Sequence, residues 1–130
     1  LSGEHLCIDN MNKAIEIVAR KLNIEIHEFT VAGFKYENLF AHRWYIGTES
    51  PNVDANAVKE LLDATLSELN DDYAVERTSA LKEVFVEILP NDTFYDYMRA
   101  IGKSGAMNKF PRVLKGEAYT KWAEWLEKNK

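Results

Sequence analysis

The sequence is poor in the residues that cross-link or interrupt small proteins. It has one cysteine, three prolines and six glycines among 130 residues. The single cysteine, Cys7, has no partner for an internal disulfide and no surrounding Cys/His cluster, which excludes a disulfide scaffold. We expect Cys7 to be a small, half-buried hydrophobic residue and the compartment to be reducing and cytoplasmic.

Positive charge and long apolar runs are also scarce. The net charge is -5 and the pI is about 5.2, so a nucleic-acid backbone is a disfavoured partner. No apolar run approaches the roughly 20 residues that a membrane span requires. The first ten residues lack the pattern of a secretory signal. They also lack an initiator methionine, so we expect a fragment of a longer chain, with a processed product or a designed chain as the alternatives.

Hydrophobic periodicity predicts helices and strands in one domain, residues 1–130. A helix is expected from Asp9 or Asn10 to Asn23, and two strands (24–34 and 39–48) are expected to form an antiparallel hairpin. An apolar stripe from Val58 to Leu69 indicates a second helix, capped by Asn52 or Asp54.

Residues 83–90 show the clearest strand alternation, and Pro90 should end that strand. A helix capped by Asp92 or Thr93 should follow and end at Gly102, and a last helix should begin near Glu117. The predicted fold is α+β: a small, mostly antiparallel three-stranded sheet packed with four to five helices.

Several kinds of chemistry find little support. His27, Glu28 and His42 would need a favourable register and a further ligand to bind a metal, so we expect no metal site. Ser79 and Ser104 lie in no nucleophile elbow and have no identifiable base. The aromatic residues have strand and helix spacing, which favours core and domain contacts over a base-stacking platform.

One connector, GKSGAMNKFPRV (102–113), combines Lys103, Lys109 and Arg112 with two glycines and a proline. Flexible backbone with cations suits a phosphate or adenylate ligand, but it is also typical of an ordinary surface loop. The spacing of a P-loop is absent. Composition alone leaves both interpretations open.

The order of several stretches supplies a resemblance. GEHL, NMNKAI, EFTVAGF, NDDYAVER, EILPNDTFYDYM and GKSGAMNKFPR follow one another along the chain. Together they resemble the C-terminal domain of the auxin-responsive promoter (Gretchen Hagen) family, particularly its bacterial-type members. The resemblance extends from Gly3 to about Leu114, and its most specific part is the pattern from Gly102 to Arg112.

The resemblance implies a lid domain (9–130) of an acyl acid amido synthetase in the adenylate-forming superfamily. Such enzymes use ATP and Mg²⁺ to convert a carboxylic acid to an acyl-adenylate, which an amine then attacks. The partner would be the enzyme's own N-terminal domain, which holds most of the ATP and acyl site. No nucleic acid or membrane partner is implied.

The same resemblance implies roles for individual residues. Lys109 would be the catalytic cation that reaches the phosphate or the acyl carboxylate. Arg112 would brace the loop or the domain contact, and Lys103 is a weaker candidate. The hinge-like start (1–8) would include Gly3, Glu4 and His5, where His5 departs from the acidic or lysine residue common in the family.

A stand-alone interaction module without catalytic activity is the alternative function. Trp122 and Trp125 would then form the partner surface. The acyl substrate and the amine acceptor are not specified by these 130 residues.

Overall fold

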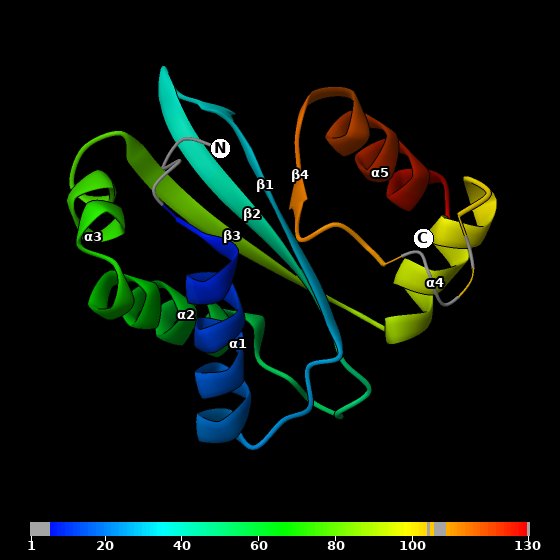
Figure 1. Cartoon of the computed structure of the whole chain (residues 1–130), viewed down its shortest axis with the longest axis horizontal. Coiled ribbons are helices and arrows are strands. Elements are labelled where there is room, and N and C mark those ends of the chain that lie inside the picture. The colour runs from blue at the N-terminus through cyan, green and yellow to red at the C-terminus, as the bar shows by residue number, and fades with distance from the viewer. Residues whose placement is uncertain (1–5, 104, 106–108, 130) are drawn as a thin grey trace.

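The protein is an α+β sandwich with helices on both faces of one sheet (Figure 1). The structure is a computed structural model that describes residues 6–103, 105 and 109–129. Five helices occur in this described part, which confirms the predicted fold class. The elements in chain order are α1 (Ile8–Leu22), β1 (Glu28–Tyr36), β2 (Leu39–Gly47), α2 (Ala55–Leu69), α3 (Asp71–Arg77), β3 (Leu81–Leu89), α4 (Asn91–Ala100), β4 (Val113–Leu114) and α5 (Gly116–Lys128).

The β1–β2 hairpin forms the middle of the sheet. The hairpin is antiparallel, as predicted, and its register pairs Glu28 with Gly47 and Tyr36 with Leu39. Glu37 and Asn38 form the two-residue connection with φ angles of 45° and 67°. Positive φ at both positions gives a turn whose twist matches the twist of the two strands, so the sequence sets the register locally.

The prediction of three mostly antiparallel strands is wrong in detail. The sheet has four strands in the order β3-β2-β1-β4, and both outer strands run parallel to their neighbours. Because α2 and α3 carry the chain back along the sheet, β3 starts beside the start of β2. β4 is only two residues long, which is too short for an alternating pattern to reveal it.

The sheet separates two hydrophobic cores. Trp44 and Ile46 of β2 face α1, α2 and α3, whereas Tyr45 faces α4 and α5. This alternation is the one that the sequence predicts, because successive strand residues point to opposite faces. The buried members of the second core are Ala32, Tyr45, Phe94, Tyr97, Met98, Phe110, Leu114, Trp122 and Leu126.

Trp122 lies at the centre of the second core. Its ring centroid is 4.8 Å from that of Phe110, 5.0 Å from Tyr97 and 5.4 Å from Phe94. Its exposed fraction is 0%, so the expectation that it forms a partner surface with Trp125 is wrong. Burying its large apolar area inside the domain is more favourable than leaving it in water.

Two predictions near the N-terminal helix also need correction. α1 begins at Ile8, with Cys7 as the N-cap and no side-chain cap, rather than at a cap formed by Asp9 or Asn10. Cys7 is exposed, not half-buried. It precedes the first residue of α1, and its sulfur contacts the side chain of Asn10. The predicted end at Asn23 is confirmed by its left-handed conformation, with φ of 54°.

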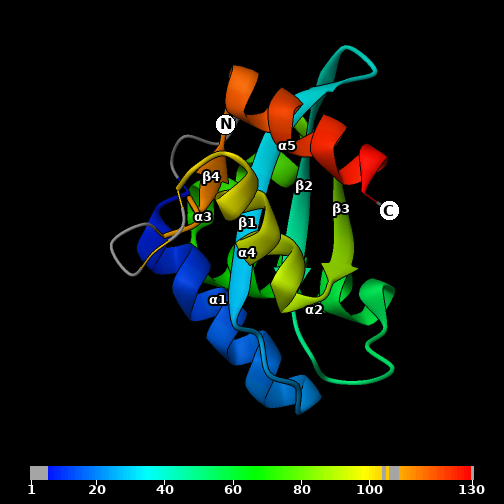
Figure 2. The same cartoon turned by 90° about the vertical axis from the view of Figure 1, so that its right-hand side faces the viewer.

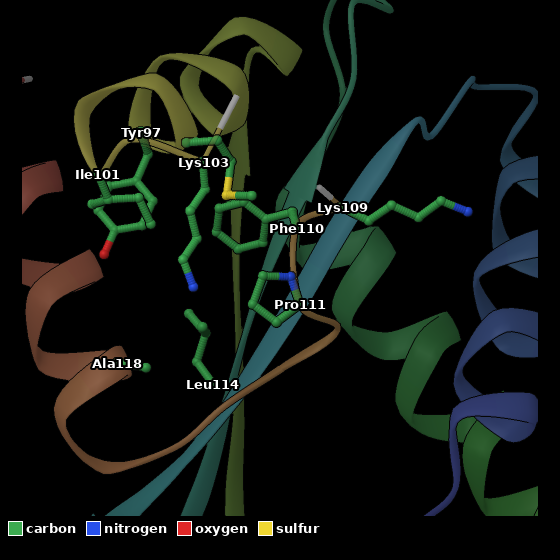
Figure 3. A pocket seen from close by; sticks show the side chains of 9 residues that line it. Tyr97, Ile101, Lys103, Lys109, Phe110, Pro111, Leu114 and Ala118 are labelled. Atoms are coloured by element: carbon green, nitrogen blue, oxygen red, sulfur yellow. The ribbon is translucent and has the colours of Figure 1, made fainter. Parts of the chain in front are cut away.

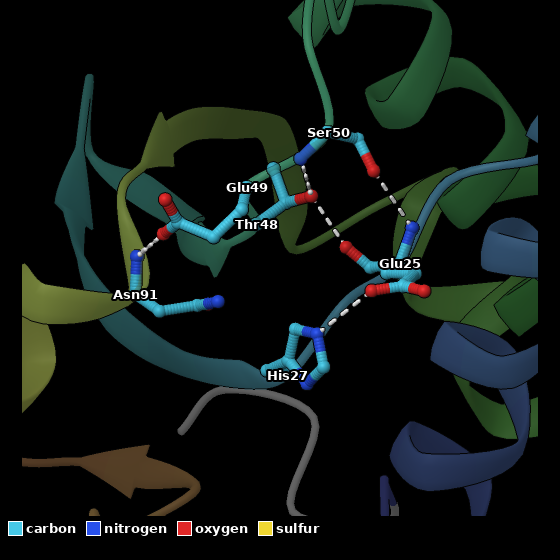
Figure 4. Close-up of polar contacts among 6 residues, drawn as sticks. All are labelled: Glu25, His27, Thr48, Glu49, Ser50 and Asn91. Carbon is cyan, nitrogen blue, oxygen red and sulfur yellow. Dashed lines mark hydrogen bonds and ion pairs between the residues drawn. The ribbon is translucent and has the colours of Figure 1, made fainter.

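The N-terminus of α4 is capped from outside the helix. The backbone N–H of Asn91 donates to the Glu49 carboxylate at 2.7 Å (Figure 4), and Pro90 occupies the cap position. Asp92 and Thr93 therefore lie inside the helix, and the prediction that one of them caps it is wrong. A carboxylate from a distant loop supplies the acceptor that a local cap would otherwise supply. For α2, Asp54 is the cap, one of the two residues predicted.

Gly47 marks a close approach between β2 and α4. A Cβ atom at this position would lie 2.8 Å from Cε1 of Phe94 and 2.9 Å from Oδ1 of Asn91. Both neighbours are buried and belong to the α4 layer, so neither is free to swing away. Glycine at position 47 therefore lets α4 pack against the end of the hairpin.

We predict that Gly47→Ala lowers the free energy of unfolding by about 1–3 kcal/mol, the usual cost of overpacking a core. Urea denaturation of the wild-type and variant proteins measures the difference. Phe94→Leu destabilises by itself, but the further cost of Gly47→Ala should shrink in that background because the ring edge is gone. An equal cost in both backgrounds would contradict the proposed overlap.

Candidate functional site

The cationic connector begins with a glycine at the end of α4. Gly102 has a φ of 75°, and the N–H of Lys103 donates to the carbonyl of Met98 at 2.8 Å. This is the arrangement in which glycine reverses the chain after a helix, as the sequence predicts. Gly105 has a φ of 116°, a conformation that residues with a side chain rarely adopt. The first part of the connector therefore follows a path that depends on glycine.

The connector is anchored at its other end by Phe110. The ring of Phe110 is 5% exposed and lies 4.8 Å from Trp122 and 5.1 Å from Phe94, both in edge-to-face contact. Aromatic pairs with this geometry are favourable beyond the area that they bury. Lys109 therefore immediately precedes a residue that is buried in the second core.

Arg112 fixes the connector to the edge of the sheet. Its Nη1 donates to Glu28 Oε1 at 2.9 Å and to the carbonyl of Phe29 at 3.0 Å. Its guanidinium carbon lies 4.4 Å from the centre of the Phe29 ring, within the range of a cation–π contact. The N–H of Val31 donates to the carbonyl of Arg112 at 2.9 Å, and β4 begins at the next residue.

Tyr95 of α4 belongs to the same polar group. Partial burial raises the pKa of its hydroxyl above the ordinary value, and the Glu28 carboxylate adds to the rise through its charge and a hydrogen bond. The Arg112 charge opposes this rise. Glu28 therefore lies close enough to act on Arg112 of the connector and on Tyr95 of α4.

A hollow of about 350 Å³ lies between the connector, α4 and the start of α5 (Figure 3). That volume falls within the range of small-molecule sites. The Lys103 amine points into the hollow, whereas the Lys109 side chain extends away from it. The lining residues are Tyr97, Met98, Ile101, Lys103, Lys109, Phe110, Pro111, Leu114 and Ala118.

The three cations of the connector differ in their surroundings. Within the described part of the chain, Arg112 has an acidic partner, but neither Lys103 nor Lys109 forms an ion pair. Both lysines are exposed. An exposed ammonium on a flexible stem is available to an anion from outside the domain.

The other predicted residues fall into two groups. Gly3, Glu4 and His5 of the expected hinge lie outside the described residues, as does Ser104. His27 and His42 are not brought together: the hairpin register places His42 opposite Gly33, whereas His27 precedes β1 and contacts Glu25 at 3.1 Å. The described residues contain no cluster of three or more metal-ligand side chains.

Sequence reasoning missed the roles of Glu28, Tyr95 and Phe110. The sequence interpretation gives Glu28 only as a possible metal ligand and assigns the aromatic residues to core and domain contacts. The signals are the position of Phe110 between Lys109 and a proline, and the carboxylate of Glu28 at the start of a strand whose next residues are mostly apolar. Neither signal identifies the residue that is contacted. Glu28 and Arg112, for example, are 84 residues apart in the chain.

Comparison with solved structures shows which fold this is. AtGH3.15 acyl acid amido synthetase in complex with 2,4-DB matches with a TM-score of 0.66, and a second structure, GH3.15 acyl acid amido synthetase, matches with 0.70. Each match is 17% identical and covers 90% of this chain. The chain spans 23% of the length of each of these proteins. At this identity the likeness establishes the fold.

The sequence comparisons address the family directly. No curated protein matches the chain. The GH3 family C-terminal domain matches residues 9–118, which is most of the chain and includes the whole cationic connector. The protein therefore belongs to the GH3 family, in which it corresponds to the C-terminal domain.

Proposed function

We propose that this domain is the C-terminal lid of an ATP-dependent acyl acid amido synthetase. The observation that carries the proposal is an exposed lysine, Lys109, on a connector anchored by Phe110 and Arg112, in a chain that belongs to the GH3 family. The similar solved structures are named acyl acid amido synthetases, which supports the reaction class. The N-terminal domain of the same enzyme is the partner.

The proposed reaction has two steps. A carboxylate attacks the α-phosphate of ATP, forming an acyl-adenylate and releasing pyrophosphate. The amine of an acceptor then attacks the acyl carbon, and AMP leaves as the amide forms. ATP and Mg²⁺ are assigned to the N-terminal domain, and this domain contributes a cation and covers the site.

In this proposal Lys109 is the catalytic residue. Its ammonium would approach the phosphate or the acyl carboxylate as the lid closes, where it offsets developing negative charge. Closure would also exclude water from the adenylate, which hydrolysis would otherwise consume. Lys103 is a weaker candidate for the same contact because its amine points into the hollow of its own domain.

Further assignments follow from the resemblance and stay predictions. Gly3, Glu4 and His5 would form the hinge that lets the lid rotate. The enzyme would be of the bacterial type and cytoplasmic. The net charge of -5 supports a partner other than nucleic acid. No described helix is long and apolar enough to cross a membrane.

We predict that Lys109→Ala in the full-length enzyme lowers turnover about 100-fold or more, the effect of removing one charge-stabilising group. Its melting temperature should hardly change because the side chain is exposed. Acid-dependent ATP–pyrophosphate exchange and thermal denaturation measure the two effects. Lys121→Ala, which removes an exposed lysine of α5, is the control. Wild-type turnover in Lys109→Ala would remove Lys109 from the mechanism.

We also predict that the 130-residue chain alone does not catalyse ATP–pyrophosphate exchange, and that the native protein is several times larger than 14.9 kDa. A denaturing blot of cell extract with an antibody against this domain measures the size. A native band near 15 kDa would contradict the lid function and favour an interaction module.

A further inference from the structure

We propose that Glu28 is a positioning residue for Lys109, acting through Arg112. The inference rests on the proposed catalytic role of Lys109 and adds a residue from the opposite end of the sequence. Glu28 itself lies at the first position of β1 and would not touch the substrate. Its function would be to hold residues 109–112 in a geometry that presents the lysine.

The contact between Glu28 and Arg112 is partly protected from water. The side chains are 18% and 28% exposed, and the 2.9 Å distance joins a carboxylate oxygen to a guanidinium nitrogen. A charge-assisted hydrogen bond at this distance is stronger and more directional than one between neutral groups. The same nitrogen also donates to the carbonyl of Phe29, so the guanidinium is held at two points.

Glu28 lies close to two elements, α4 and the connector, that are distant from it in the sequence. It lies on β1, pairs with Arg112 of the connector, and its charge acts on the hydroxyl of Tyr95 of α4. The connector follows α4 and returns to the edge of β1, so Glu28 lies where the middle of α4 and the returning connector both approach the sheet. Movement of α4 relative to the sheet would therefore strain the Glu28 contacts.

The chain between Lys109 and Arg112 is short and stiff. It contains Phe110, which is buried against Trp122, and Pro111, whose ring restricts φ. A shift of Arg112 is thus passed to Lys109 over three residues, at most about 10 Å of extended chain. The glycine-containing side of the connector offers no comparable anchor in its described residues, namely Gly102, Lys103 and Gly105.

Loss of the carboxylate should loosen this anchor specifically. Without Glu28, the guanidinium is half-buried over Phe29 with no opposing charge, and solvent competes for it. The two-residue β4 and the Val31–Arg112 hydrogen bond would then hold the connector at the sheet edge. The pairing of the two-residue β4 with β1 is a weak constraint. Residues 109–112 should therefore detach from the sheet more often, beginning at Arg112.

The test uses Glu28→Gln in the full-length enzyme, because glutamine keeps the shape and removes the charge. We expect turnover to fall about tenfold with little change in the KM for ATP, since the nucleotide site lies elsewhere. Amide hydrogen exchange at Lys109, Phe110 and Arg112 should become faster. The matched control is Glu37→Gln at the hairpin turn. It removes the carboxylate of an exposed ion pair, in which Oε1 of Glu37 lies 3.2 Å from Nζ of Lys82.

The deciding experiment is the cycle of Glu28→Gln with Lys109→Ala. If Glu28 acts through Lys109, Glu28→Gln should cause no further loss of turnover when Lys109 is already alanine. The same tenfold loss in both backgrounds would overturn the inference, because Glu28 would then act independently. So would wild-type turnover in Glu28→Gln, which would show that Phe110 suffices to place the lysine.

The outcomes separate this inference from the proposed function. Turnover lost in Lys109→Ala but kept in Glu28→Gln rejects the role of Glu28 and leaves the role of Lys109 intact. Turnover kept in Lys109→Ala rejects both. Faster exchange in both Glu28→Gln and Glu37→Gln would indicate general destabilisation and would also reject specific positioning.

Discussion

The packing around Trp122 is the contact on which the functional half of the molecule depends. Its indole lies against rings from β2, α4 and the connector: Tyr45, Phe94, Tyr97 and Phe110. Among the described helices, α4 and α5 supply the buried helical residues of this core, and Figure 2 shows both in front of the sheet. One buried side chain of α5 thus joins the packing of α4 to that of the returning connector, and burial of its large apolar area supplies the driving force.

That packing gives the connector two unlike ends. Its C-terminal end is held by an aromatic contact, an ion pair and a backbone hydrogen bond, whereas its N-terminal end turns on Gly102 and Gly105. A lysine placed near the anchored end keeps a defined starting position while its long stem stays free. In the proposed function, Lys109 meets its ligand only after the lid has moved. Because the backbone beside Lys109 is already held by Phe110 and Arg112, the lysine loses mainly side-chain freedom when it makes that contact.

The acidic character of the chain is consistent with this arrangement. A net charge of -5 gives the domain no general attraction for polyanions, so the exposed Lys103 and Lys109 are each a separate positive feature on an acidic chain. Attraction between such a feature and a phosphate is short in range at physiological ionic strength. In the proposed function, specificity for an adenylate therefore has to come from the N-terminal domain, and the cation of this domain acts at close contact.

The sequence by itself determined the local elements. Alternation in β2 separated Trp44 from Tyr45, the turn at Glu37 and Asn38 set the hairpin, and Gly102 ended α4, because each depends on residues that are neighbours in the chain. The motif from Gly102 to Arg112 also identified the connector. Only the tertiary structure decided the parallel placement of β3 and β4, the cap of α4 by Glu49 and the clamp of Arg112 by Glu28. These contacts join residues about 40 to 80 positions apart, and their partners are chosen by packing of the whole domain, which no local pattern records.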